Sequence, residues 1–370
     1  MAFVWKSHKD IWKGEGVYHL TFAVAERRGL LGKLVALGES RSYTRCVKRN
    51  NVTDVNMGCS TQAPKLTSKM ATTELSPFGF AVLEQLMAMP ARYTRDSDSE
   101  PVMTICGKQF MPDHLHVVIW IKKDLGKSIR QIAQGFRIGV RKIAVNMGVW
   151  NNVDGHPLDV PFIRTLSHKG QLRAMIDYVH ANPDNAWMRR LNPELYTIRR
   201  RLEHAGLLFD CMGKARLLEY PDRQVVALSR SLTKEQIEDE VQKALRNAKR
   251  GVVTYTAAIN EGEKAVAKAI REGKYPLVVM MMGGFPAEGS EAARYFHPSG
   301  VYHQACGEGR LYLMAPHESN YQNVELMTRT ETELRRKAES KGCHYEPLPH
   351  SSTRWRMIAG NMMLEMIAGD

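Results

Sequence analysis

The pattern of apolar and polar positions in the first half of the chain predicts both strands and helices. Residues 17–24 (VYHLTFAV) and 102–121 are rich in β-branched and aromatic residues, which is typical of strands. Residues 75–89 and 128–147 instead repeat apolar side chains every three or four positions, which predicts helices. Ser128 is a suitable N-cap for the second helix. We therefore expect an α+β domain over this part of the chain.

The helix predicted over residues 128–147 has two faces of opposite character. An apolar stripe would bury one face, and it consists of Ile129, Ile132, Ala133, Phe136, Val140 and Ile143. Another face carries Arg130, Arg137 and Arg141. An arginine stripe of this kind can follow a phosphate backbone. The alternative is that these are ordinary solvated arginines on a protein surface.

After residue 222 the pattern changes to short apolar runs that alternate with amphipathic helices. The runs RQVVALSR, VVTYT, PLVVMMMGG and RLYLMAP are expected strands. Between them, one helix is predicted to begin after Thr233, in a capping-box pattern with Gln236, and another after Asn260. Such alternation predicts a parallel, Rossmann-like sheet. The segment contains neither GxGxxG nor a P-loop, so no dinucleotide or ATP site is predicted.

These patterns divide the chain into two domains and a tail, which its length of 370 residues allows. We expect an α+β domain over residues 1–215, an α/β domain over 222–330 and a helical tail over 331–370. Residues 38–72 are rich in Ser, Thr, Asn and Arg, and they are predicted to form a loop insertion in the first domain.

The whole chain has a net charge of +13, and nearly all of this positive charge lies in its first part. Residues 1–220 contain 32 Lys and Arg against 20 Asp and Glu, whereas residues 221–370 contain 20 against 19. This asymmetry favours a polyanionic partner for the first part, most simply nucleic acid. The alternative is a merely basic soluble domain.

Composition argues against several other classes of protein. No uncharged apolar stretch is long enough to span a bilayer, and the first residues carry charges that a signal peptide would lack. The six cysteines include no CxxC pair, which argues against a zinc module or a disulfide framework. We therefore expect a cytoplasmic protein with no membrane partner.

Two histidines stand out in the strand-like segment MPDHLHVVIW, residues 111–120. His114 and His116 are two positions apart, so a strand would project both imidazoles from one face. Two neutral imidazoles side by side can hold a divalent cation. Asp113 either orients one of these imidazoles or simply caps the strand.

A second candidate segment is AMIDYVHANPDNAW, residues 174–187. Its apolar spacing predicts a helix, on which Tyr178 and Asn182 would share a face. Pro183 disfavours helical geometry at Asn182, so we expect the helix to end or kink there. For each polar residue an ordinary role is also open: Tyr178 could pack half-buried on a sheet, and Asn182 could cap a following helix.

Together, MPDHLH and YVHANP resemble the motifs MPxHxH and YxxxNP of the REP-associated tyrosine transposases, a group of HUH single-tyrosine transposases. They occur in the same order, separated by a helix of similar length, and GVYHLTFAV is similar to the first strand of that family. The resemblance covers roughly residues 15–200. It implies an antiparallel sheet with helices, of ferredoxin/RRM-like type. INEGEKAVAKAIREG, GGF and GRLYLMAP resemble the DprA-like Rossmann-type domain of some longer relatives.

The resemblance also implies a mechanism. His114, His116 and Asn182 would bind Mg²⁺ or Mn²⁺, although imidazole alone would equally suit Zn²⁺. Tyr178 would attack the scissile phosphate and form a 5′-phosphotyrosine, which leaves a free 3′-OH. A free tyrosine has a pKa of about 10, so it needs activation or a strongly polarised target.

The implied substrate is single-stranded or hairpin DNA, which the enzyme would nick and rejoin. Arg130, Arg137, Arg141 and Arg164 are the candidate DNA contacts. A homodimer is usual in the family, and the tyrosine could act in cis or in trans. Two alternatives stay open: a catalytically silent hairpin-binding protein, or a ligand-binding protein that acts through its C-terminal α/β domain.

Overall fold

The structure is a computed structural model, and it describes most of the chain. The described residues are 15–37, 69–94, 100–151, 155–294, 296–298 and 300–369. Most of the insertion predicted over 38–72 lies outside them. The chain divides into two compact units, residues 1–187 and residues 188–370, and each is described by itself.

The first unit contains a four-stranded antiparallel sheet. Its strand order is β4-β5-β1-β6. A separate antiparallel pair, β2 and β3, precedes the first long helix. The bounds are β1 Gly16–Ala23, β2 Gly32–Ala36, β3 Ala71–Leu75, β4 Met103–Phe110, β5 His114–Ile121 and β6 Phe162–Thr165.

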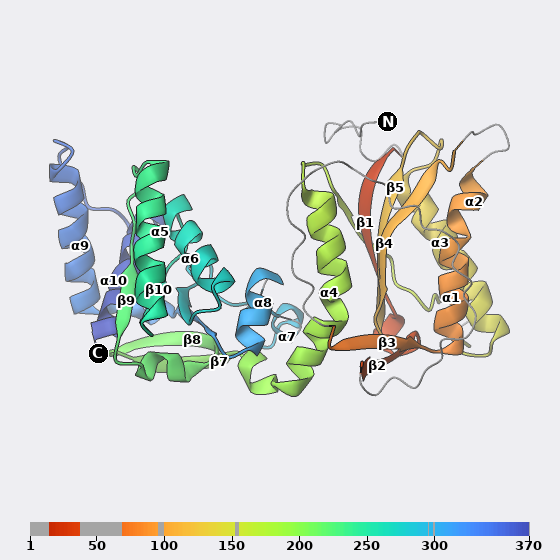
Figure 1. Ribbon diagram of the computed structural model, residues 1–370, viewed down its shortest axis with the longest axis horizontal. Coiled ribbons are helices and arrows are strands. Elements are labelled where there is room, and N and C mark those ends of the chain that lie inside the picture. The colour runs from red at the N-terminus through yellow and green to blue at the C-terminus, as the bar shows by residue number, and fades with distance from the viewer. Residues whose placement is uncertain are drawn as a thin grey trace. The chain divides into compact units, whose positions relative to one another are not determined.

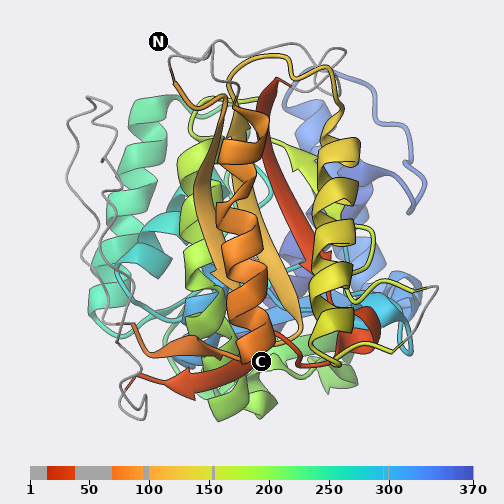
Figure 2. The same cartoon turned by 90° about the vertical axis from the view of Figure 1, so that its right-hand side faces the viewer.

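Helices cover both faces of this sheet (Figures 1 and 2). Helices α1 (Pro77–Met87) and α3 (Ile129–Asn146) lie on one face, and α4 (Gln171–Leu191) lies on the other. The short α2 spans Met89–Tyr93, and the 3₁₀ turn η2 spans Ala25–Arg27. An antiparallel sheet packed between helices is the α+β organisation that was expected.

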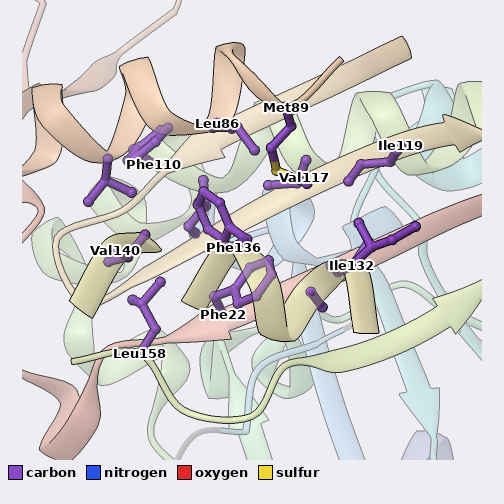
Figure 3. Packing of buried hydrophobic residues seen from close by; sticks show 14 of the residues in the cluster. Phe22, Leu86, Met89, Phe110, Val117, Ile119, Ile132, Phe136, Val140 and Leu158 are labelled. Carbon is purple, nitrogen blue, oxygen red and sulfur yellow. The ribbon is translucent and has the colours of Figure 1, made fainter. Parts of the chain in front are cut away.

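The face toward α1 and α3 holds the main apolar core of the first unit (Figure 3). Phe22 of β1 stacks at a tilt on Phe136 of α3, with 5.1 Å between ring centroids. The predicted apolar stripe of α3 is confirmed, since Ile129, Ile132, Ala133, Phe136 and Val140 are buried and Ile143 packs against them. Ser128 caps α3 in a capping box with Gln131.

The second unit is built on a six-stranded mixed sheet, in the order β7-β8-β12-β11-β10-β9. Strands β9 to β12 are parallel, and β8 and β7 add antiparallel to β12. This is the expected α/β pattern with an antiparallel edge. The bounds are β7 Arg199–His204, β8 Leu207–Gly213, β9 Arg223–Val226, β10 Val253–Thr256, β11 Leu277–Met280 and β12 Leu311–Pro316.

Helices cover both faces of the second sheet as well. Helices α5, α6 and α8 pack on one face, and α9 and α10 on the other, where Trp355 is fully buried. Thr233 and Asn260 cap α5 and α6, as predicted, and each forms a capping box. The bounds are α5 Lys234–Lys249, α6 Glu261–Glu272, α7 Glu291–Arg294, α8 Gly300–Gly307, α9 Val324–Glu339, α10 Thr353–Gly369, η3 Pro193–Tyr196, η4 Ala215–Glu219 and η5 Glu318–Gln322.

The boundary between the units differs from the predicted one. We expected the first domain to extend to residue 215, but β7 and β8 pair within the second sheet. The reason is a non-local contact, because β8 hydrogen-bonds to β12, about a hundred residues further along the chain. The predicted tail is likewise part of this unit, since α10 packs against its sheet. Within the described residues, no helix is long and apolar enough to cross a membrane.

Candidate active site

The face of the first sheet that lies under α4 carries polar side chains in register across neighbouring strands. Strands β1 and β5 are antiparallel, with Thr21 opposite His116 and Ala23 opposite His114. Because directly opposed residues of a sheet share a face, His19, Thr21, His114 and His116 all point toward α4. The prediction that the two β5 histidines share a face is therefore confirmed.

His116 is held by two neighbours from β1. Its Nδ1 lies 3.0 Å from Nε2 of His19 and 3.0 Å from Oγ1 of Thr21. The His19 and His116 rings are stacked, with 5.2 Å between centroids. Because Nδ1 already has two partners, Nε2 is the nitrogen through which His116 could bind a metal ion.

His114 is oriented by the residue that precedes it. Its Nδ1 lies 2.7 Å from Oδ1 of Asp113, and Arg27 lies 3.5 Å from the other carboxylate oxygen. Burial raises the pKa of Asp113, but the hydrogen bond and charge of His114 and the charge of Arg27 outweigh it and hold that pKa below its usual value. Of the two roles open for Asp113, the structure therefore shows the orienting one.

His19 of β1 and His116 of β5 have strongly lowered pKa values. Burial, helped by the charges of His114 and His19, lowers the pKa of His116 to about 3. Burial, helped by the charge of Arg164, lowers the pKa of His19 to about 4. Both imidazoles are therefore neutral at physiological pH, which is the form that binds metal ions.

Tyr178 lies directly over this histidine cluster. Its ring is edge-on to His116, with 5.8 Å between centroids, and edge-on to His19, with 6.3 Å. Helix α4 is fixed there by a small apolar cluster, in which Leu172, Met175 and Val179 pack with Val17 and Val118 of the sheet. The sequence-predicted pair of motifs is thus brought together in one site.

Asn182 lies one helical turn beyond Tyr178 on α4. Its Nδ2 donates to the carbonyl oxygens of Tyr178, at 2.9 Å, and of Val179, at 3.2 Å. Of the two outcomes expected at Pro183, an end or a kink of the helix, the end is wrong, because α4 continues to Leu191. Pro183 lacks the N–H that would bond to the Val179 carbonyl, and the Asn182 amide supplies that donor instead.

The two β5 imidazoles under α4 are of a type that can bind a divalent cation. His114 and His116 offer two imidazoles whose ring centroids are 4.9 Å apart, and the Asp113 carboxylate that contacts His114 is the kind of partner that orients many metal-bound histidines. Asn182 turns its amide nitrogen toward the helix, so its Oδ1 is the atom able to act as a ligand. Within the described residues, no group of three His, Cys, Asp or Glu side chains is arranged to hold a metal ion. Asn182 or substrate oxygens would therefore have to complete the shell.

The four candidate arginines are not equivalent. Arg137 is buried and donates to the carbonyl of Leu158 and to Gln134, so it supports the chain that leads into β6. Arg130 is exposed and Arg141 half-buried on α3, across the sheet from Tyr178. Arg164 is exposed on β6, directly opposite His19, and is the one of the four on the same sheet face as Tyr178.

Sequence reasoning did not single out His19 and Thr21. The signal was present, because Val17, His19 and Thr21 alternate with Tyr18, Leu20 and Phe22 along β1. The sequence does not show the register between β1 and β5, which places Thr21 opposite His116.

Comparison with known proteins finds no matching family model, no similar curated protein and no similar solved structure.

Proposed function

We propose that this protein is a metal-dependent endonuclease and strand transferase that nicks and rejoins single-stranded or hairpin DNA through Tyr178, in the manner of HUH transposases. The observation that carries the proposal is the position of Tyr178, edge-on to His116 with 5.8 Å between centroids, over a sheet face that also presents His114. The β-α-β-β-α-β order of the four-stranded sheet and its two helices α1 and α3 supports it.

In this mechanism the phenol oxygen of Tyr178 attacks phosphorus. The Oη–P bond forms and the P–O3′ bond breaks, so the DNA 5′ end is held as a phosphotyrosine and the other end leaves as a 3′-OH. The released 3′ oxygen takes a proton, and the phenol gives its proton to solvent. A later attack by a 3′-OH reverses the bond changes and joins two ends without loss of bond energy.

His19 and His116 are suited to positioning rather than to proton transfer. With pKa values lowered to about 4 and about 3, these imidazoles bind a proton too weakly to serve as general bases near neutral pH. Held by His114, His116 and Asn182, a divalent ion such as Mg²⁺ or Mn²⁺ would supply positive charge that polarises the phosphate. Arg164, opposite His19 on β6, adds the positive charge of a guanidinium group on the same face.

The test is capture of the covalent intermediate. The purified protein is incubated with a pool of labelled hairpin DNAs and Mg²⁺ or Mn²⁺, and the products are separated on a denaturing gel. We expect a protein–DNA band that requires metal and is lost in Tyr178→Phe and in His114→Ala. Tyr93→Phe makes the same chemical change on α2 of the same unit and should keep the band.

Two results would contradict the proposal. Hairpin binding without any cleavage or capture would identify a silent DNA-binding protein. Absence of any preference for DNA would reject the transposase assignment, and would favour a function located in the second unit.

A further inference from the structure

Strand β6 forms one edge of the first sheet and exposes an aromatic ring there. Phe162 is 67% exposed, which is unusual for so large an apolar side chain. It lies opposite Thr21, which in turn lies opposite His116. Phe162, Thr21 and His116 therefore form one row across three strands and share the face that carries Tyr178. Two strand spacings separate Phe162 from His116, roughly 10 Å.

A groove adjoins this ring on the outer side of β6. It has a volume of about 670 Å³ and is lined by Arg130 and Gln134 of α3 and by residues 160–163. Val160 is 76% exposed at the same place. Two residues beyond Phe162, the exposed Arg164 shares its sheet face and lies opposite His19. The edge strand thus presents an apolar ring that has Arg164 on its own face of the sheet and shares the groove with Arg130 of α3, on the other side of the edge.

This combination matches the chemistry of a single nucleic acid strand. A flat, exposed aromatic ring offers a stacking platform to any base, and arginines on either side can contact successive phosphates. Pairing with a second protein strand is a poorer fit, because β6 has only four residues and is preceded by Pro161, which cannot donate a hydrogen bond.

We propose that Phe162 is a base-stacking residue that positions the DNA strand for attack by Tyr178. The DNA strand runs from the groove beside Arg130 on the α3 side, around the β6 edge over Phe162, to Arg164 and the histidine cluster on the α4 side. The nucleotide on Phe162 lies beside the scissile phosphate. This inference rests on the proposed function and adds to it the path of the substrate and a positioning residue.

Binding to a fluorescent hairpin with a single-stranded flank tests the inference. Fluorescence anisotropy is measured in the Tyr178→Phe background, in which no cleavage can occur. We expect Phe162→Leu to raise Kd about tenfold, within the range measured for loss of one stacked base. Phe162→Trp should bind at least as tightly as the parent. Phe80→Leu, which alters an exposed phenylalanine on α1, should leave Kd unchanged.

Arg164→Gln gives a second readout that a merely structural role would not change. If Arg164 contacts one phosphate, the slope of log Kd against log salt should fall by about 0.7. Phe162→Leu should weaken binding equally at all salt concentrations, because stacking releases no counterions.

Three outcomes separate this inference from the proposed function. If the wild type captures DNA covalently but Phe162→Leu binds within twofold of its parent, the stacking role is overturned and the proposed function stands. If the wild type neither binds nor cleaves DNA, the proposed function fails and the inference fails with it. If Phe162→Leu instead converts a dimer to a monomer in analytical ultracentrifugation, the edge is a contact between copies of the chain and the inference is overturned.

Discussion

The two faces of the first sheet are built from the same strands but are used differently. On β1, Tyr18, Leu20 and Phe22 face α1 and α3 and are at most 2% exposed. The intervening His19 and Thr21 face α4 and bind a histidine of β5. One face therefore supplies most of the apolar burial of the unit, which leaves the other face available for polar groups. Neighbouring residues on one strand can therefore have separate effects on stability and on chemistry.

The largest effect should come from opening the apolar face. Phe22→Ala removes a fully buried ring that packs on Phe136, and it should lower the free energy of unfolding by about 3–5 kcal/mol. Urea denaturation followed by circular dichroism measures the change. A loss below about 1 kcal/mol would show that this face does not dominate the stability of the unit.

A smaller effect should appear on acidification, and it belongs to the α4 face. His116 has a pKa of about 3 when folded and an ordinary value near 6.5 when unfolded, so the unfolded state binds more protons below pH 6.5. Stability should therefore fall as the pH drops through this window, by about 2 kcal/mol at pH 5 relative to pH 8. The titratable and charged groups around His116 are His19, His114, Tyr178 and Asp113, with Arg27 acting at longer range.

Comparison with His116→Gln isolates that contribution. Unfolding of both proteins is measured at pH 8 and pH 5, and the variant should lose less stability between the two. Equal losses in the two proteins would show that His116 titrates normally in the folded state.

Metal affinity should depend on the carboxylate behind His114. Asp113→Asn keeps the shape of the side chain but removes the charge that orients the imidazole, so Mn²⁺ binding should weaken about tenfold or more. Isothermal titration calorimetry measures the affinity, and Asp124→Asn in the exposed loop before α3 is the matched control. An unchanged affinity in Asp113→Asn would mean that the Asp113 carboxylate does not support metal binding through His114.

The smallest effect is expected for Thr21→Val, beside Phe22 on the same strand. It removes one hydrogen bond to His116 and should cost about 1 kcal/mol or less. The imidazole NMR signals of His116 should nevertheless shift, because Nδ1 loses one of its two neighbours. A stability loss as large as that of Phe22→Ala would abolish the contrast between the two faces.

Local pattern was sufficient to predict several of these features. The apolar stripe and Ser128 cap of α3, the shared face of His114 and His116, and the shared face of Tyr178 and Asn182 all follow from short periodicities. The α+β and α/β organisation of the two parts followed in the same way.

The features that were not predicted depend on contacts between distant residues, or on a side chain that takes the place of a backbone hydrogen-bond donor. The domain boundary required the pairing of β8 with β12, and the role of His19 required the register of β1 on β5. The continuation of α4 past Pro183 required the Asn182 amide to replace a missing backbone donor. Neither kind of interaction leaves a periodic signal in the sequence.

The β2–β3 pair has a consequence for how this chain tolerates changes in length. Ala36 and Ala71 lie opposite each other at the end of this pair, and the Leu37 N–H donates to the carbonyl of Met70. Asp184 of α4 fixes the start of β3 by accepting from the backbone N–H groups of Met70 and Ala71. The residues between these strands therefore leave and re-enter the fold at neighbouring points. Loop closure costs only about 0.6 kcal/mol for each doubling of loop length. We therefore expect insertions, deletions or fusions between β2 and β3 to have little effect on the stability of the fold.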